Sequence, residues 1–221
     1  MRYYKLLRNS ALFLPLAVSV IASCNSSVNK QDKSLNVSDT LKSVKSINPY
    51  IALDQSPMDM SYFPNNYPIL KMNGTDSSGL VARVIYSRPQ KKGRMILGEP
   101  GTKSLREYGK EWRLGANEAT EIEFFQNVVI NGKTIAKGRY IIYCIPFTDK
   151  WTIILNTNLF TWGLHMDKQK DVFSVNVPVE LQAPPLEDFT MVFEPAAYGA
   201  DLIIAWDNVK TVLRISTRTA N

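Results

Sequence analysis

Apolar and polar residues alternate one for one along three stretches of this 221-residue chain, and this period of two constrains its fold most. The stretches are DVFSVNVPV (171–179), FTMVFEP (189–195) and VKTVLRIS (209–216). Because successive side chains of a strand point to opposite faces, each stretch predicts a strand with one buried face. Two further runs, RYIIYCI (139–145) and WTIIL (151–155), are apolar on both faces, which indicates central strands covered on each side.

Turn-forming residues separate the expected strands at short intervals. Asn131-Gly132 stands between two apolar runs and predicts a tight hairpin, because both residues tolerate a positive φ. We expect Asp207-Asn208 to form a similar turn and PFTDKW (146–151) to close a longer hairpin. Strands joined by turns, without helical segments between them, predict an all-β fold. The architecture that we expect is an antiparallel β-sandwich, with a jelly-roll-like or an immunoglobulin-like arrangement as alternatives.

One segment departs from the strand pattern. In KSLREYGKEWRLG (103–115), the large side chains of Leu105, Tyr108 and Trp112 follow helical spacing. Gly109 interrupts them and costs a helix about 1 kcal/mol relative to Ala. We therefore expect a single helical turn or a long loop here, and at most one short helix in the fold.

The first residues have the features of a bacterial export signal. Arg2, Lys5 and Arg8 precede an apolar run over residues 11–22, which is too short for a membrane-spanning helix. The run ends in IASC, which resembles the lipobox of bacterial lipoproteins, in which the Cys becomes the lipid-modified first residue. An ordinary signal peptide with Cys24 incidental is the alternative. We expect a lipidated Cys24 and a location in the cell envelope, anchored to a membrane on its periplasmic or outer-surface face.

This signal divides the chain into parts. We expect a lipoprotein signal peptide at 1–23 and a flexible tether at 24–48, whose polar residues are too poor in large apolar groups to form a core. A single β-sandwich domain follows at 49–217, and then a short tail at 218–221. Residues 1–23 hold three of the 26 basic residues and no acidic one, so 23 basic residues remain against 20 acidic ones, a net charge of +3. Such a weak charge gives no reason to expect nucleic acid as a partner.

The scarcity of His and Cys excludes several kinds of site. His165 is the single histidine, and the one cysteine besides Cys24 is Cys144, in an apolar strand. A zinc site needs several imidazole or thiolate ligands, so we expect no metal. No nucleophile motif accompanies His165, and the sequence has neither a phosphate-binding loop nor a dinucleotide fingerprint. We expect no cofactor, and we expect Cys144 to be a buried core residue.

Six motifs along the body occur in this order: VIYSRPQKKGRMILG, YGKEWRLGANEATEIEF, AKGRYIIYCIP, WTIILN, TWG and LIIAWDN. Together they resemble a bacterial family catalogued as domain-of-unknown-function family 2911, over about residues 79–215. The resemblance implies a secreted or lipid-anchored β-protein and no particular activity. The family's usual PAGTY reads AKGRY here (136–140), and the loop before Tyr108 reads GEPGTKSLRE instead of a short apolar-proline run.

Three carboxylates, Glu118, Glu121 and Glu123, lie close together in the sequence, and the last two share one face of an expected strand. A glycosidase needs two carboxyl groups roughly 5–10 Å apart, and residues i and i+2 of a strand are about 7 Å apart. The same alternation is typical of the wet face of any strand. The pattern therefore allows a carboxylate-dependent hydrolase without favouring it.

Residues 88–113 carry eight basic and three acidic side chains, which concentrates positive charge in one segment. Arg binds carboxylate or phosphate through two parallel hydrogen bonds, and Trp offers a flat apolar face to a sugar ring. Alternatively, Arg88 and Arg113 form internal ion pairs with Glu111 or Glu118. The candidate ligand-binding residues are Arg88, Lys92, Arg94, Trp112, Arg113, Asn117, Glu118 and Trp162.

Three hypotheses about function follow from these patterns. The first is a lipid-anchored, non-catalytic β-sandwich of the cell envelope that binds a glycan, an acidic ligand or an envelope protein. The second is a carboxylate-dependent, glycosidase-like hydrolase that uses Glu118 with Glu121 or Glu123. The third is a structural subunit of an envelope assembly.

Overall fold

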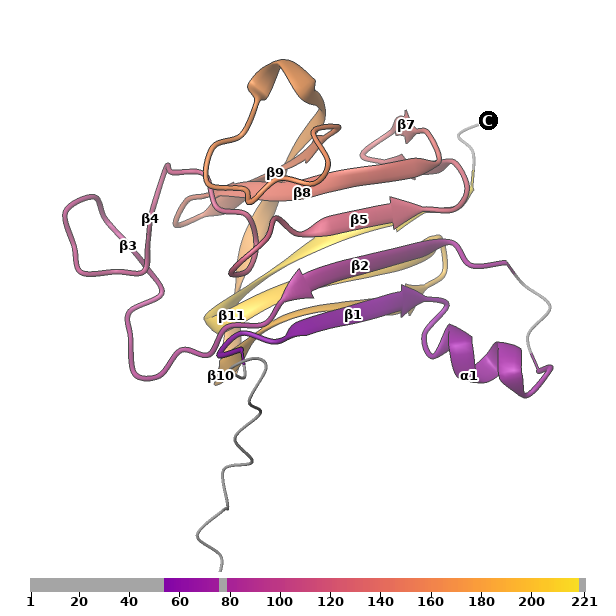
Figure 1. Ribbon diagram of the computed structural model, residues 1–221, viewed down its shortest axis with the longest axis horizontal. Helices are drawn as coiled ribbons and strands as arrows, with labels where there is room; N and C mark the ends of the chain where they lie inside the picture. Colours follow the sequence, from indigo (N-terminus) through magenta and orange to yellow (C-terminus); the bar gives the residue numbers. More distant parts are fainter. Residues whose placement is uncertain (1–53, 76–78, 219–221) are drawn as a thin grey trace, which may run out of the picture. The chain divides into compact units, whose positions relative to one another are not determined.

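The computed structural model describes residues 54–75 and 79–218, which form an all-β fold (Figure 1). Within these residues, nine strands form one antiparallel sheet in the order β1-β2-β5-β8-β9-β10-β11-β6-β7, and β3 and β4 form a parallel pair. The strands are β1 (Met58–Phe63), β2 (Ala82–Ser87), β3 (Leu97–Gly98), β4 (Arg106–Glu107), β5 (Glu121–Phe124), β6 (Val128–Ile130), β7 (Lys133–Ile135), β8 (Gly138–Pro146), β9 (Lys150–Asn156), β10 (Asp171–Ala196) and β11 (Gly199–Ser216). The predicted signal peptide, Cys24 and the tether lie outside the described residues.

Helical structure is minor, as predicted. The described residues contain one α-helix, α1 (Tyr67–Met72), and one short 3₁₀ turn, η2 (Lys168–Lys170). Neither is long and apolar enough to cross a membrane. The segment 103–115, for which a helical turn was one expectation, forms a long loop that includes the short strand β4.

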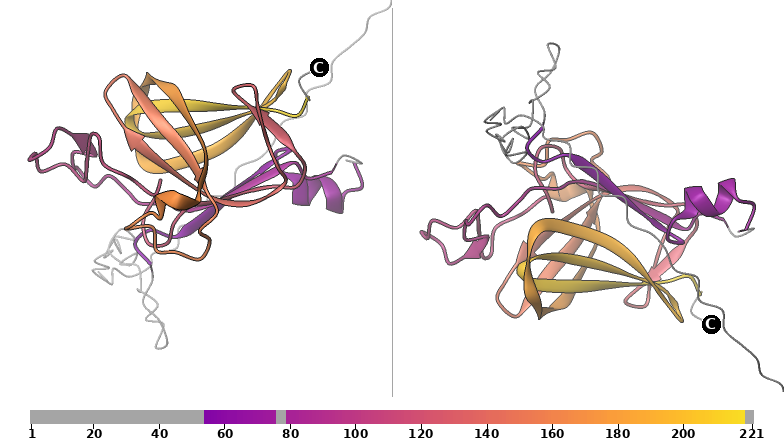
Figure 2. Two further views of the ribbon diagram at one scale, coloured as in Figure 1. Left: turned by 90° about the horizontal axis from the view of Figure 1, so that it is seen from above. Right: turned by 90° about the horizontal axis from the view of Figure 1, so that it is seen from below.

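The sheet folds over on itself into two layers, which gives the sandwich-like arrangement that the strand pattern predicts. The long strand β10 belongs to both layers: residues 171–178 pair with β9, whereas residues 179–196 pair with β11. Figure 1 shows β11 behind the layer of β1, β2, β5 and β8, and Figure 2 shows the two layers from above and from below. Because one continuous sheet supplies both layers, the arrangement differs from the two separate sheets of an immunoglobulin domain.

Two of the three predicted turns are confirmed. Asn131-Gly132 joins β6 to β7 with both residues at positive φ, and PFTDKW joins β8 to β9. The third prediction, a hairpin at Asp207-Asn208, is wrong, because β11 continues through both residues. Asp207 takes a φ of 54° opposite the irregular part of β10, so it marks a bend in a long strand. The hairpin between β10 and β11 turns at 196–199 instead.

A large hydrophobic cluster fills the space between the layers. Its aromatic centre consists of Trp112, Trp151, Phe189 and Trp206, with ring centroids 5.1–5.8 Å apart. Each such aromatic pair contributes about 0.5–1.5 kcal/mol beyond the burial of its area. The alternating stretches point their apolar side chains into this cluster, which confirms the predicted strand faces.

The central strands β8 and β9 are buried on both faces, as their sequences predict. On β8, Ile142 and Cys144 face the main core, whereas Ile141 and Tyr143 belong to a second apolar cluster on the outer face. Cys144 is fully buried, and burial raises the pKa of its thiol well above the usual value. It is therefore a core residue, as expected, and not an accessible thiol.

Polar side chains of the edge strand β1 bond both to the other layer and to the neighbouring strand β2. Ser61 Oγ accepts a hydrogen bond from the Phe193 backbone N–H at 3.1 Å, and the Tyr86 hydroxyl donates to Asp59 at 3.0 Å. Burial is the main cause that raises the pKa of Tyr86, to about 12. Tyr86 therefore keeps its proton in the folded protein at a pH where an unfolded tyrosine loses it.

This difference predicts a loss of stability at alkaline pH. The pKa of Tyr86 is about 12 in the folded chain against 10.0 ordinarily, so its contribution is complete below pH 10 and is lost as the pH rises toward 12. At about 1.4 kcal/mol per pH unit, the loss amounts to about 2–3 kcal/mol. Urea unfolding between about pH 9 and pH 12 should therefore show a shallower decline for Tyr86→Phe than for the wild type. Parallel curves for the two proteins would contradict the assignment.

Candidate functional site

Charged side chains from the neighbouring strands β2, β5 and β8 meet on the outer face of the layer that these strands form with β1. The register places Arg83 of β2 opposite Glu123 of β5, and Glu123 opposite Arg139 of β8. Arg83 forms an ion pair with Glu123, with 2.6 Å between Nη2 and Oε2, and Arg139 forms one with Glu121. The hydrogen bond to Glu121 is the main cause that raises the pKa of Arg139. Glu121 and Glu123 do share one strand face, as predicted, and each has an arginine partner.

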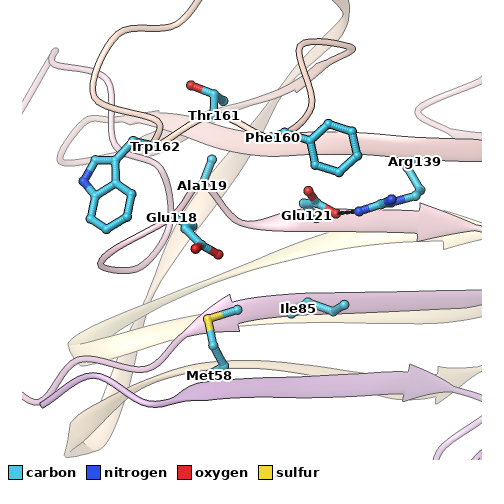
Figure 3. Close-up of a pocket in the computed structure, with 9 residues that line it drawn as sticks. All are labelled: Met58, Ile85, Glu118, Ala119, Glu121, Arg139, Phe160, Thr161 and Trp162. Atoms are coloured by element: carbon cyan, nitrogen blue, oxygen red, sulfur yellow. Dashed lines mark hydrogen bonds and ion pairs between the residues drawn. The ribbon is translucent and has the colours of Figure 1, made fainter. Parts of the chain in front are cut away.

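A hollow of about 450 Å³ opens on this face of the sheet (Figure 3). This volume lies within the range of about 300–1,000 Å³ that is common for small-molecule sites. Five separate segments of the chain supply the lining residues, which are Met58, Ile85, Glu118, Ala119, Glu121, Arg139, Phe160, Thr161 and Trp162.

Two aromatic side chains from the loop between β9 and β10 stand at the rim of the hollow. Phe160 is 83% exposed and Trp162 is 54% exposed. Phe160 takes a φ of 60°, a conformation that costs a bulky residue free energy. A guanidinium group packs against each ring: Arg139 lies 5.2 Å from the Phe160 centroid and Arg113 lies 5.8 Å from the Trp162 centroid. The rings are therefore held in place while much of their surface stays open to solvent.

Gly163 lets this loop approach the segment 113–119 closely. A Cβ atom at Gly163 would lie 2.8 Å from the Ala119 Cβ and 3.1 Å from the Arg113 Cβ, and the φ of 75° also favours glycine. Arg113 Nη1 donates to the Trp162 carbonyl at 2.8 Å, and the Ala119 N–H donates to the Thr161 carbonyl at 3.2 Å. These contacts fix the Thr161–Gly163 backbone against the start of β5.

The base of the loop is fixed by polar contacts to the central strands. The Tyr143 hydroxyl lies 3.0 and 2.9 Å from the two carboxylate oxygens of Asp171, and Asn156 Nδ2 donates to the same carboxylate at 2.7 Å. Leu159 and Met166 pack on the outer apolar cluster. The aromatic rim therefore stands on a loop that is held by hydrogen bonds and by burial.

The turn at 113–118 forms one end of the hollow, and two buried contacts shape it. Trp112 Nε1 donates to the Gly115 carbonyl at 3.2 Å, and Thr120 Oγ1 donates to the Leu114 carbonyl at 2.6 Å. A Cβ at Gly115 would lie 2.7 Å from the Ser87 carbonyl oxygen, so this turn needs glycine. The turn brings Glu118 to the mouth of the hollow.

The structure separates the residues that the sequence proposed for one site. Trp162, Glu118 and Glu121 line the hollow, and Arg113 supports it from behind Trp162 without lining it. Trp112 is only 2% exposed, so the interpretation of Trp112 as a wall for a ligand is wrong. Its indole packs between aromatic rings of the core.

The remaining candidates lie outside the hollow. Arg88 lies 3.2 Å from a carboxylate oxygen of Asp59 and 3.7 Å from one of Asp188.

The other candidates also bond to groups of the protein itself. Lys92 Nζ donates to Gln55, and the Arg94 guanidinium donates to backbone carbonyls of its own loop. Asn117 Nδ2 donates to an Asp54 carboxylate oxygen at 2.7 Å, and Glu123 bonds Arg83 as described above.

Arg88 does form internal ion pairs, but the expected partners, Glu111 and Glu118, are wrong, because its partners are Asp59 and Asp188. Glu111 pairs with Lys168 instead, at 2.8 Å. Arg113 has no ion pair within the described part of the chain and uses the Trp162 carbonyl. Burial is the main cause that lowers the pKa of Arg113, and the nearby charge of Arg106 adds to it.

Several residues that line the hollow were not predicted from the sequence. Phe160 left one signal, because FTWG places two aromatic residues beside a glycine in a loop, outside any strand period. Arg139 is the first residue of a run that was expected to be apolar on both faces, and its position opposite Glu123 depends on the register. Met58 and Ile85 left no signal, because only the pairing of β1 with β2 places them on this face. Within residues 54–75 and 79–218, no three His, Cys, Asp or Glu side chains lie together as a metal site would require.

The fold and the site together define an all-β domain with an aromatic-rimmed hollow on the outer face of its sheet. A family model described as protein of unknown function (DUF2911) matches residues 71–215, and the chain belongs to this family. The resemblance of the six sequence motifs is thereby confirmed. Comparison with curated proteins and with solved structures found no match.

Proposed function

We propose that the protein is a lipoprotein of the cell envelope whose β-domain binds a glycan, without catalysis, in the aromatic-rimmed hollow. The export signal, the lipobox at Cys24 and the polar tether in the sequence support the membrane anchor. The anchor holds the domain outside the cytoplasm, where surface glycans are accessible ligands.

The observation that carries the proposal is the pair of exposed rings of Phe160 and Trp162 above a polar floor. Aromatic faces pack on the apolar face of a sugar ring, and charged side chains bond its hydroxyl groups. The hollow offers both, because the Glu121–Arg139 pair and Glu118 lie beneath the two rings (Figure 3). Exposed aromatic side chains on a strained and well-anchored loop indicate a binding surface.

The charges favour a sugar over an acidic ligand. Arg139 is the one basic residue among those that line the hollow, and it is paired with Glu121. An acidic ligand would therefore have to displace Glu121 and lie near the second carboxylate, that of Glu118. A neutral ligand rich in hydroxyl groups neither has to displace Glu121 nor is repelled by Glu118.

The test is a titration of the full chain with neutral oligosaccharides of glucose, mannose and N-acetylglucosamine, followed by calorimetry. Phe160→Ala and Trp162→Ala should each weaken binding about tenfold or more, because each removes one stacking face. Leu181→Ala is the matched control, since Leu181 is an exposed apolar residue on β10, outside the hollow. The absence of binding to every oligosaccharide, or equal losses in all three variants, would overturn the proposal.

A carboxylate-dependent hydrolase is the second candidate, because Glu118 and Glu121 both line the hollow. It ranks below binding for two reasons. The carboxylate of Glu121 is engaged in an ion pair with Arg139, so it is not free to act on a glycosidic bond. Glu118 is exposed, whereas a glycosidase acid needs an apolar surrounding to hold its proton. Release of reducing ends from a bound oligosaccharide, abolished by Glu118→Gln, would favour the hydrolase.

A further inference from the structure

The charges in the hollow do not balance. Glu121 and Arg139 neutralise each other, whereas Glu118 has neither an ion pair nor a side-chain hydrogen bond to any residue that the structure describes. Figure 3 shows the Glu118 carboxylate on the Trp162 side of the hollow and the Glu121–Arg139 pair on the Phe160 side. One end of the site therefore carries a carboxylate without a direct partner beside an exposed indole ring.

The two ends of the hollow suit different chemical groups. A guanidinium lies near each ring, 5.2 Å from the Phe160 centroid and 5.8 Å from the Trp162 centroid, so the two ends differ in their carboxylates. At the Phe160 end, Glu121 is already paired with Arg139 and has no free charge for a second cation. The ion pair at this end still offers free guanidinium N–H groups and carboxylate lone pairs to hydroxyl groups. At the Trp162 end, a bare carboxylate accepts hydrogen bonds but donates none, so it favours an ammonium group.

We propose that the ligand is an amino sugar, with its ammonium group on Glu118, its ring face on Trp162 and its hydroxyl-bearing end toward Glu121 and Arg139. This inference rests on the proposed function and specifies the class of glycan. A charge-assisted hydrogen bond is about twice as strong as a neutral one, so the free amine is the group that the site selects. An N-acetylated sugar of the same shape has no cation for Glu118.

Calorimetry with two matched ligands tests the proposal: β-1,4-linked oligomers of glucosamine and of N-acetylglucosamine, of equal length, at about pH 6. The full chain should bind the glucosamine oligomer at least tenfold more tightly. In Glu118→Gln this preference should disappear, because the glucosamine oligomer loses its ammonium contact, whereas the N-acetylated oligomer has no ammonium group to lose. Glu194→Gln is the control, because it removes the same charge from an exposed position on the other layer. Since Glu118 is exposed, the variant should fold as the wild type does, which circular dichroism checks.

Each outcome separates this inference from the proposed function. Equal binding of both oligomers, or a preference that survives in Glu118→Gln, overturns the amino-sugar assignment and leaves glycan binding intact. Loss of the preference in Glu194→Gln as well shows a general charge effect and also overturns it. Binding of neither oligomer overturns the inference. The proposed function is overturned when the neutral oligosaccharides and both of these oligomers all fail to bind.

Discussion

Trp112→Ala is expected to lower the free energy of unfolding by about 3–5 kcal/mol, the usual cost of removing a large aromatic side chain from a core. Trp112 is 2% exposed and packs against Trp151, Phe189 and Trp206 at centroid distances of 5.6, 5.1 and 5.8 Å. The variant leaves a cavity at the centre of the aromatic cluster. It also removes the donor that bonds the Gly115 carbonyl in the turn before Glu118.

Chemical denaturation measures this loss, and two variants make it interpretable. Trp112→Phe keeps a ring in the core and should cost only about 1–2 kcal/mol. Trp162→Ala removes the same side chain from a half-exposed position and should cost less than about 1 kcal/mol. If Trp112→Ala were as stable as Trp162→Ala, the placement of Trp112 in the core would be wrong.

Gly163→Ala is expected to cost about 2–4 kcal/mol and to abolish ligand binding in the hollow. A non-glycine residue at a φ of 75° costs about 1 kcal/mol or more. The added Cβ would also meet the Ala119 Cβ at 2.8 Å, and overpacking of this kind costs about 1–3 kcal/mol. Relief of the clash requires the loop to move off the segment 113–119, which shifts Trp162 and breaks its bond from Arg113.

Gly101→Ala is a matched control for this substitution. Gly101 has a similar φ of 83°, but no atom lies within 4 Å of the position that an added Cβ would take. It should therefore show the backbone cost alone, about 1 kcal/mol, with unchanged binding. Equal losses of stability and binding in the two variants would show that the close approach at Gly163 does not position the aromatic rim.

Much of the fold was predictable from the sequence, because strand faces and tight turns depend on local chemistry. The alternation around Phe173, Met191 and Leu213 predicted which side chains are buried, and the structure confirms it. The failure at Asp207-Asn208 has a physical reason. Both a hairpin and a bulge need a residue that tolerates positive φ, so the dipeptide alone does not distinguish a turn from a bend.

The candidate site was predictable only in part. Glu118, Glu121 and Trp162 were singled out from their types and spacing, and they line one hollow. The basic segment was misleading, because the ion pairs that neutralise Arg88 come from β1 and from β10, far away in the sequence. Local charge counts do not reveal such distant partners.

By itself, the sequence determined the all-β class, the buried faces of the strands and the family, because each depends on patterns within short segments. Only the tertiary structure decided that Trp112 belongs to the core and Trp162 to a rim. Both tryptophans lie in irregular segments, where no period orients a side chain, so the packing of distant strands sets the direction of each. The hollow likewise exists only where five separate segments meet.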